Sequence, residues 1–378
     1  MDFKEQQMSA GQGAPDHGPG LDPTAAALAD PVRPPAQRLT RRDLVRAGDR
    51  IAKRAEAMGL NRWFWGEGIV LDGLLRWAEA RGKKPPKFVA GFVDSHLAQG
   101  IRPDHVNSLA PGAAAVRIGR TEVAPILLDW LAQPGAVTRA ENGALEHWPG
   151  GLWAGTVQMA GSFLLQWART TGEVTWLLRT GRQWLAHAEI LQDRSGLMVH
   201  GSHQGEPIGC HWGRANAWMA LAGCDFLETA RQFQGAELDP SERQELDRLA
   251  TVVGDDLTDQ LVALVRHQPS HGLWEVLVDG HPETAGIIET SATAGIAAAL
   301  FRASRLGLGD RFAVAARRAM HGLHSYVEDD GTLSLTSAGT VLQLIPFGYS
   351  VIRNDHIQPW GQGLALHAYA EALSDLAE

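Results

Sequence analysis

The chain has 378 residues, of which 44% are apolar, and its 34 basic and 43 acidic residues give a formal net charge of −9. This is the composition of an ordinary globular protein, which excludes wholesale disorder and a fibrous repeat. The acidic balance, with no run of Lys or Arg longer than two, argues against nucleic-acid binding and against a basic membrane-binding patch.

Taken in chain order, the sequence begins with a tail and continues as a series of helices. Residues 1–37 are rich in Gly and Pro and show little apolar pattern, which predicts a disordered tail. From residue 38 a helical spacing of apolar residues dominates, and we expect residues 38–378 to form a single domain. Twelve helices are predicted, at 39–59, 64–82, 85–100, 108–119, 121–133, 152–172, 173–192, 212–233, 239–268, 288–307, 310–329 and 359–377.

Two weak internal repeats organise these helices. In the first, a helix ends at Gly and the next begins after a few polar residues, as in WARTTGEVTWL. In the second, a Gly turn precedes a short strand-like stretch, as in DRSGLMVHG. We therefore expect an all-α fold, a closed (α/α)6 barrel of six hairpins with small-residue inner helices and long loops at one end. Two packed all-α domains are the alternative, but no Pro-, Gly- or Ser-rich linker in the middle of the chain favours them.

Aromatic and polar residues gather where four inner helices are predicted to start. An indole is a flat platform for a sugar ring, and Arg and His donate hydrogen bonds to hydroxyls and carboxylates. Arg214 and Trp218 are four residues apart on one helix, so both can address one ligand. The four segments are NRWFWGEG (61–68), RPDHVNS (102–108), HWPGGLWAGTVQM (147–159) and MVHGSHQGEPIGCHWGRANAW (198–218).

These residues also have purely structural interpretations. Asp104 precedes a predicted helix and can be an N-cap. Arg214 can pair with a carboxylate of a neighbouring hairpin, and Trp153 and Trp218 can be core residues. Residue types and spacing alone leave this choice open.

The motifs resemble glycoside hydrolase families 88 and 105, the unsaturated glucuronyl and rhamnogalacturonyl hydrolases. The resemblance runs from about residue 60 to the end of the chain, over WFWGEG, PDHVNS, GLWAGTVQMAGSFL, SGLMVHG, HWGRANAW, IETSATAGIAAAL and PWGQGLALHAYAEAL. It implies an (α/α)6 barrel that hydrates the C4=C5 double bond of a terminal unsaturated uronic acid and so releases it from a lyase-generated oligosaccharide. That oligosaccharide is the expected partner.

The resemblance also implies roles for individual residues. Asp104 matches the family's first active-site aspartate. The resemblance implies substrate-binding roles for Trp153, His200, Arg214 and Trp218. We add Trp65 and Trp212, which lie in the same segments, as further candidates for substrate binding. The family's proposed proton donor is an aspartate two residues after Trp153, but this chain has Gly155 there. Asp104 is the first candidate for the acid, and Glu146 and Glu206 are displaced alternatives.

Three other functions stay open. Loss of the donor at Gly155 fits a catalytically impaired uronide-binding protein, and another (α/α)6 sugar enzyme such as an epimerase is possible in principle, although its His pairs are not evident. A zinc site would need ligands from the GCHW segment (209–212), Cys224, His200 and His203. Cys224 lies within an apolar helix, which favours a buried free thiol. We therefore expect neither a metal nor a cofactor.

The compartment is inferred from what the sequence lacks. Cys210 and Cys224 are the two cysteines, too few for a disulfide framework. No apolar run approaches the roughly 20 residues of a membrane span, and the first residues lack the basic and apolar regions of a signal peptide. We expect a soluble cytoplasmic protein.

Overall fold

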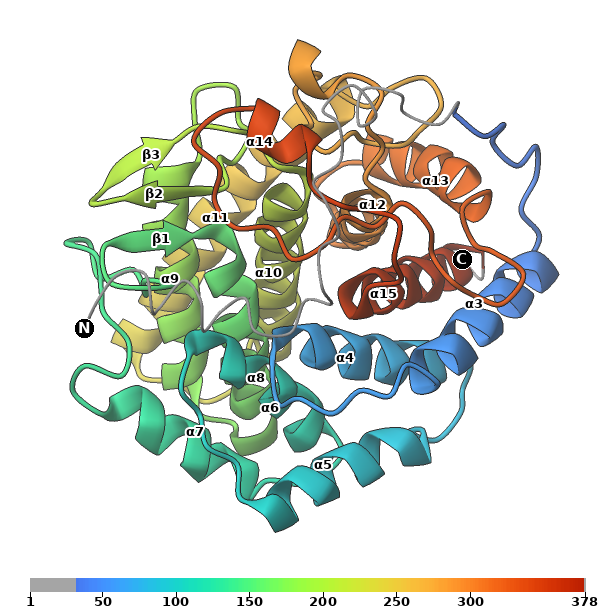
Figure 1. Cartoon of the computed structure of the whole chain (residues 1–378). Coiled ribbons are helices and arrows are strands. Elements are labelled where there is room, and N and C mark those ends of the chain that lie inside the picture. Colours follow the sequence, from blue (N-terminus) through green and yellow to red (C-terminus); the bar gives the residue numbers. More distant parts are fainter. Residues whose placement is uncertain (1–31, 377–378) are drawn as a thin grey trace.

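The computed structural model describes residues 32–376, which form a ring of helical hairpins (Figure 1). Six inner helices form a closed ring, in which each packs on the next and the last packs on the first. The inner helices are α4 (Trp65–Ala80), α6 (Ala110–Arg117), α8 (Ala154–Thr171), α10 (Gly213–Gln232), α12 (Thr290–Arg305) and α15 (Pro359–Asp375). The outer helices are α3 (Arg41–Glu56), α5 (Lys87–Gln99), α7 (Val123–Ala132), α9 (Val174–Leu191), α11 (Pro240–Arg266) and α13 (Arg311–His324). The expected (α/α)6 barrel is confirmed, and each of the twelve predicted helices is present.

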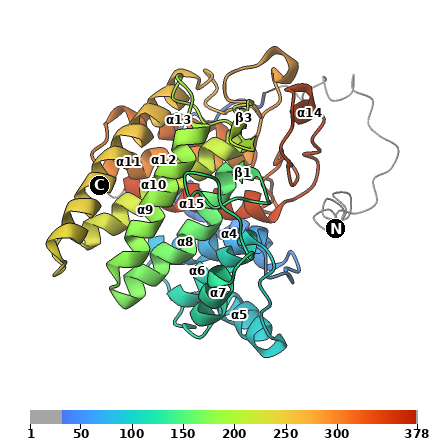
Figure 2. The same ribbon diagram turned by 90° about the vertical axis from the view of Figure 1, so that its left-hand side faces the viewer.

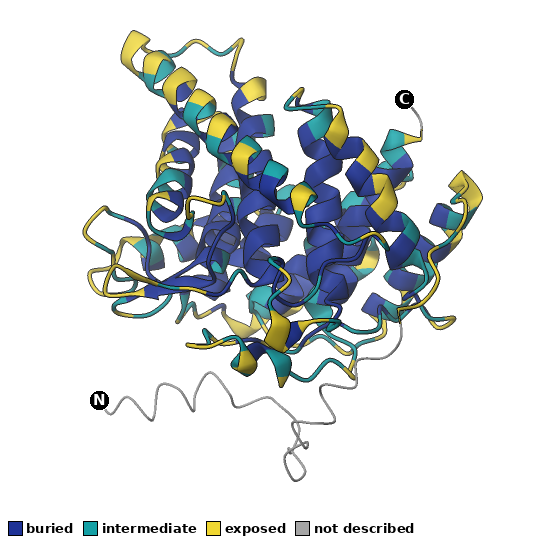
Figure 3. Ribbon diagram, turned by 90° about the horizontal axis from the view of Figure 1, so that it is seen from above, coloured by how far each residue is buried: buried dark blue, intermediate teal, exposed yellow. Residues whose placement is uncertain are grey.

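Small residues allow the inner helices to approach closely. In α12, every residue from Thr290 to Ala303 is buried. A Cβ atom at Gly73 of α4 would lie 2.5 Å from the Gly363 carbonyl oxygen of α15, so the ring closes where two glycines meet. The outer helices bury one face and expose the other (Figure 3). Both sequence patterns thus follow from the ring. The inner helices need small residues because they pack closely on two neighbours, and the outer helices are amphipathic because only one face is buried.

The second repeat corresponds to a tight turn after an outer helix. Residues six apart pair across the turn in three places, Arg139 with Leu145, Gln192 with Met198, and Val327 with Leu333. The turn glycines have positive φ, where side chains with a Cβ are strained. At Gly196 and Gly331 a Cβ would also lie within 3.0 Å of a backbone oxygen of the next outer helix.

A small sheet and a short helix were not predicted. Strands β1 (Gly151–Trp153), β2 (Gly201–His203) and β3 (Glu206–Ile208) form an antiparallel sheet in that order. The helix α14 (Phe347–Ser350) interrupts the long connection between α13 and α15. The sheet and α14 lie at the same end of the barrel, which we call the mouth (Figure 2). Two single 3-10 turns, η1 (Val106–Leu109) and η2 (Pro282–Thr284), complete the described elements.

Most of the predicted tail, residues 1–31, lies outside the described residues. Its last residues lie against α13 and the turn that follows it. The Ala36 amide donates to the His321 carbonyl at 2.9 Å, and the Arg33 guanidinium is 2.8 Å from a Glu328 carboxylate oxygen. Within residues 32–376, no helix is long and apolar enough to cross a membrane.

Away from the mouth, a buried network of charged residues joins the inner helices. Asp225 of α10 accepts hydrogen bonds from Arg76 of α4 at 2.9 Å and from Arg302 of α12 at 2.5 Å. Asp72 of α4 accepts from Arg76 at 2.7 Å and from Arg117 of α6 at 3.0 Å. Burial opposes ionisation of Asp225, but the Arg302 and Arg76 charges outweigh it and hold the pKa of Asp225 below its ordinary value.

Candidate active site

The inner helices all begin at the mouth, and several begin at an aromatic residue. Trp65 is the first residue of α4, Trp153 and Trp212 are the N-caps of α8 and α10, and Trp360 is the second residue of α15. Because helix N-termini carry partial positive charge, their convergence favours an anionic ligand. The aromatic residues expected at the inner-helix starts do lie there, and their role in a site stays a prediction.

Stacked rings cross one side of the mouth. The His147 ring is parallel to Trp153, with centroids 4.3 Å apart and an interplanar angle of 7°. His200 follows, 5.1 Å from Trp153 and 4.1 Å from Trp212. The ring nitrogens Nε1 of Trp153 and Trp212 are buried and have no hydrogen-bond partner within residues 32–376. Buried donors of this kind normally have an acceptor, and none is present for these two within residues 32–376.

His200 is held in place by its backbone and by its side chain. Its amide donates to the Cys210 carbonyl at 3.0 Å, and its carbonyl accepts from the Ala154 amide at the start of α8 at 3.1 Å. Its Nδ1 atom is 2.7 Å from the Tyr349 hydroxyl. Burial, followed by the nearby Arg214 charge, holds the pKa of His200 well below its ordinary value, so the ring is neutral at neutral pH.

Arg214 is fully buried and bound to protein groups on several sides. Its Nη1 donates to the Ser337 carbonyl at 2.9 Å and lies 3.2 Å from a Glu289 carboxylate oxygen. Its Nη2 donates to the Ala338 carbonyl at 2.8 Å and to the Thr340 hydroxyl at 3.1 Å. The salt bridge to a neighbouring hairpin, considered as an alternative, is therefore present. Nε is buried without a partner among the described residues, and the guanidinium lies 4.4 Å above the Trp212 ring.

The residues that cover Arg214 belong to a loop between α13 and α15. We call residues 337–353 the strap. Its ends are tied by a 2.7 Å hydrogen bond from the Ala338 amide to the Arg353 carbonyl, as in a compact Ω-loop. Sequence analysis did not single it out, because the strap has no helical or strand periodicity.

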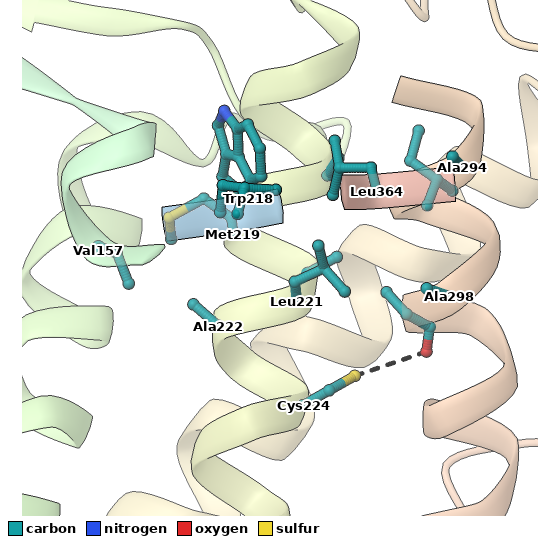
Figure 4. Packing of buried hydrophobic residues seen from close by; sticks show 14 of the residues in the cluster. Val157, Trp218, Met219, Leu221, Ala222, Cys224, Ala294, Ala298 and Leu364 are labelled. Atoms are coloured by element: carbon teal, nitrogen blue, oxygen red, sulfur yellow. Dashed lines mark hydrogen bonds between the residues drawn. The ribbon is translucent and has the colours of Figure 1, made fainter. Parts of the chain in front are cut away.

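Trp65 and Trp218 line the centre of the barrel below the stacked rings. Trp65 stacks on Trp360 with centroids 4.4 Å apart, and its ring meets the edge of Trp218 at 6.3 Å. Trp218 is 3% exposed and is the uppermost residue of the core cluster in Figure 4. Gly155 lies beside it, since a Cβ at that position would be 3.5 Å from Trp218 Cδ1 with no closer neighbour. The position at which the resemblance implies an aspartate therefore lies beside Trp218.

Asp104 lies at the mouth but at its edge. It is exposed and accepts a hydrogen bond from the Ser108 hydroxyl at 3.1 Å. The neighbouring His105, not Asp104, is the N-cap of η1, so the plain N-cap interpretation of Asp104 is wrong. The His105 ring meets the His147 ring at 4.6 Å and links Asp104 to the stacked rings.

Sequence analysis missed three residues of this site, His147, Tyr349 and Trp360. His147 and Trp360 lie in segments that were quoted for other reasons, HWPGG and PWGQG. Burial, followed by the charges of His105 and His200, holds the pKa of His147 well below its ordinary value, and its Nδ1 is 3.1 Å from the Thr156 hydroxyl. A neutral imidazole of this kind is a poor proton donor.

Cys224 lies far from the other residues considered for zinc. Cys224 is eleven residues into α10 from the mouth, about 16 Å at 1.5 Å per residue, and its thiol donates to the Ala299 carbonyl (Figure 4). His200 is at the mouth. Within residues 32–376, no group of three or more His, Cys, Asp or Glu side chains is arranged to hold a metal ion.

The fold and these residues together define a class, the (α/α)6 barrels whose inner helices begin at a cluster of aromatic side chains. The model of Glycosyl Hydrolase Family 88 matches residues 44–376, so the chain belongs to this family of glycoside hydrolases. The resemblance stated from the motifs is thereby confirmed.

Individual relatives agree with this assignment. Unsaturated rhamnogalacturonyl hydrolase YesR of Bacillus subtilis (strain 168) is 29% identical over 343 residues, which cover 86% of this chain and 93% of that protein. A possible member of family 105 from Salmonella enterica serovar Paratyphi A superposes with a TM-score of 0.78 at 23% identity, over 91% of this chain and 97% of that one. The unsaturated glucuronyl hydrolase of Bacillus sp. GL1 superposes with a TM-score of 0.63 at 17% identity, over 89% and 97% of the two chains. At these identities the two structures support the fold alone.

Proposed function

We propose that this hydrolase removes a terminal 4,5-unsaturated uronic acid from oligosaccharides that a polysaccharide lyase has produced. The observation that carries the proposal is the group of unpartnered buried donors at the mouth, Nε1 of Trp153, Nε1 of Trp212 and Nε of Arg214. They surround His200 at converging helix N-termini, where an acidic sugar would supply both the negative charge and the acceptor oxygens. The name of the Bacillus subtilis relative supports the same substrate class.

The reaction is a hydration. A lyase leaves a C4=C5 double bond next to the ring oxygen, which makes the terminal sugar an enol ether. An acid delivers a proton to C4, the positive charge is shared between C5 and the ring oxygen, and water adds at C5 and loses a proton. The hemiketal that results opens and releases the rest of the oligosaccharide as its alcohol. One carboxyl group can serve as acid and base, whereas common glycosidases need two that flank the glycosidic bond.

Asp104 is the carboxyl group that we propose for the proton transfer. It is the candidate at the mouth that matches a family position and is open to solvent. Glu146 is buried and accepts from the Gly150 amide at 3.0 Å, which engages it in the turn before β1. Glu206 is exposed in the β2–β3 hairpin. Both remain weaker candidates, because neither corresponds to a family position.

The experiment is to incubate the protein with lyase-generated unsaturated disaccharides and follow the loss of the enol-ether absorbance. Wild type should consume the substrate. The kcat of Asp104→Asn should be at least 10²-fold lower, about what a placed acid contributes. Glu206→Gln is the matched control, and its kcat should equal that of wild type. If Asp104→Asn matches wild type, the assignment of the acid is wrong.

A second function is favoured by one observation, the glycine at position 155. A protein that kept the pocket and lost its donor would bind unsaturated uronides without turnover. Calorimetric binding to wild type with no loss of absorbance would establish this function and exclude the first.

The cytoplasmic location remains part of the proposal, and Cys210 and Cys224 are both free and buried, as a reducing compartment allows.

A further inference from the structure

The strap contains one large side chain that is fully buried. Tyr349 is 0% exposed, and its ring lies 5.9 Å from His200 and 6.4 Å from Trp212. Around it the strap exposes five large apolar side chains, Val341, Leu344, Ile345, Phe347 and Val351. The strap is therefore held to the barrel by the buried Tyr349 side chain and by the hydrogen bonds to Arg214. Its exposed apolar side chains do not contribute packing contacts of this kind.

The hydrogen bond between Tyr349 and His200 has a definite direction. The Tyr349 oxygen already receives the Gln343 amide at 3.4 Å. Its own proton has one acceptor within residues 32–376, Nδ1 of His200 at 2.7 Å. Since burial raises the pKa of the Tyr349 hydroxyl and lowers that of His200, the proton stays on the tyrosine and the imidazole is neutral.

A donor at Nδ1 determines which nitrogen of His200 carries the hydrogen. With Nδ1 accepting, the hydrogen of the neutral ring is on Nε2. Within the described part of the chain the His200 side chain makes one hydrogen bond, through Nδ1, which leaves Nε2 without a partner. The ring lies between Trp153 and Trp212, whose Nε1 donors are buried and unpartnered. His200 then adds a third directed N–H donor to this set.

We propose that Tyr349 is a positioning residue that holds His200 in the Nε2–H tautomer, so that His200 donates to an oxygen of the substrate. The strap also orients the Arg214 guanidinium, through Ser337, Ala338 and Thr340. The inference rests on the proposed uronide hydrolysis for its kinetic consequence, but the tautomer is a property of the protein alone.

The chain contains a matched control. Tyr369 of α15 makes the same kind of bond, with its hydroxyl 2.8 Å from Nδ1 of His324 on α13, and it is also 0% exposed. This pair joins an inner helix to an outer one and does not contact the stacked rings. Tyr349→Phe and Tyr369→Phe therefore remove the same atom from the same environment, one at the site and one away from it.

The kinetic test compares kcat/KM for an unsaturated disaccharide. The kcat/KM of Tyr349→Phe should be about tenfold lower than that of wild type, the effect of one hydrogen bond that orients a substrate donor. The kcat/KM of Tyr369→Phe should match that of wild type. The double variant His200→Gln with Tyr349→Phe should be no worse than His200→Gln alone, because Tyr349 acts through His200. Additive losses, or equal rates for the two tyrosine variants, would overturn the proposal.

The second measurement needs no variant that has lost Tyr349. In wild type labelled with nitrogen-15 histidine, the His200 signals are those missing from His200→Gln, and their shifts report the tautomer. Nε2–H is the expected form, and Nδ1–H would overturn the assignment even if Tyr349→Phe failed to fold. If wild type shows no turnover, the proposed function is wrong. The nitrogen-15 shifts of His200 then decide by themselves whether Tyr349 sets the tautomer.

Discussion

Gly155 occupies the position at which the resemblance implies an aspartate, and the geometry there leaves room for one. If the wild type binds an unsaturated disaccharide without turnover, we expect Gly155→Asp to gain measurable hydrolysis, because a placed acid typically contributes about 10²-fold or more. A Cβ at this position meets only Trp218 at 3.5 Å, an ordinary contact, and a carboxylate in the first turn of α8 is favoured by the helix dipole.

Gly155→Asn is the control for that substitution, since it adds the same volume without an acid. Absorbance assays on both proteins provide the measurement. If Gly155→Asp binds the disaccharide as wild type does and still gains no rate, a missing proton donor is not what limits this enzyme.

His211 offers a test through pH. It joins two loops, with Nε2 at 2.8 Å from Asp193 and Nδ1 at 2.9 Å from Asp279. Burial alone would lower the pKa of His211, but hydrogen bonds to Asp279 and Asp193 outweigh it and raise the pKa. The stabilisation is therefore complete below the unfolded value of about 6.5 and is lost as pH rises through the raised folded value.

The matching variant is His211→Gln, compared with wild type by thermal unfolding. The difference in Tm should be largest near pH 5.5 and should shrink by pH 8. The exposed His203 supplies the control, because His203→Gln should show no such trend. A difference for His211→Gln that is constant across this range would show that the ring is not charged in the folded protein.

At the residue scale, the sequence predicted where site residues lie better than what they contact. Trp153, His200 and Trp212 do gather at one end, because helix starts converge in a toroid. The partners of Arg214 could not be found, since Ser337 and Thr340 are more than 120 positions away. Residue types and their local spacing do not reveal that a loop so far along the chain packs on the Arg214 guanidinium.

At the scale of elements, the strap depends on Arg214 more than on its own surface contacts. Arg214→Met should leave the Glu289 carboxylate buried without its counter-charge, which typically costs about 3–5 kcal/mol. It should also make the strap amides exchange with solvent at least tenfold faster, because local opening no longer breaks the bonds to Ser337, Ala338 and Thr340.

Hydrogen-exchange mass spectrometry on peptides spanning the strap is the measurement. Arg353→Ala is the control, because this arginine of the strap pairs with the exposed Asp355 and such pairs contribute little. Unchanged exchange in Arg214→Met would mean that the strap is held by Tyr349 alone.

Elements differ in how strongly their sequences predict them. The twelve long helices were predicted with ends within three residues, except that α13 ends at His324 and not at 329. Each of them buries a periodic face or consists of small residues. Strands β1 to β3 are three residues each and α14 is four, too short for a period to emerge. The Gly turn and extended stretch of the second repeat were recognised, but not the pairing of β1 with β2 across two hairpins.

At the scale of the whole molecule, Asp225 is where charges from several inner helices meet. Asp225→Asn should destabilise the fold by about 3–5 kcal/mol, since Arg76 and Arg302 lose a buried counter-charge. Because the folded pKa of Asp225 is lowered, its contribution is present above the unfolded value of about 4 and is lost as pH falls through the folded value.

Urea unfolding at pH 7 measures the first effect, and the same experiment repeated between pH 4 and pH 2 measures the second. Asp329→Asn is the control, because Asp329 is fully exposed beside Arg50 and its loss should leave the midpoint unchanged. Equal midpoints for wild type and Asp225→Asn would show that the network adds no stability. The sequence contained a hint of this network in single charges, such as Arg302, within apolar helices, but not which charges meet.

The contact of α15 with α4 has a consequence for how the protein is made. The glycine pair Gly73 and Gly363 joins residues 290 positions apart, so the ring stays open until nearly the whole chain has left the ribosome. Until then the inner faces of α4 and α12 have no partner on one side and present apolar surface to water. A ribosome stalled before residue 359 should therefore hold a nascent chain that chaperones bind, whereas release of α15 converts it in one step to a closed, protease-resistant ring.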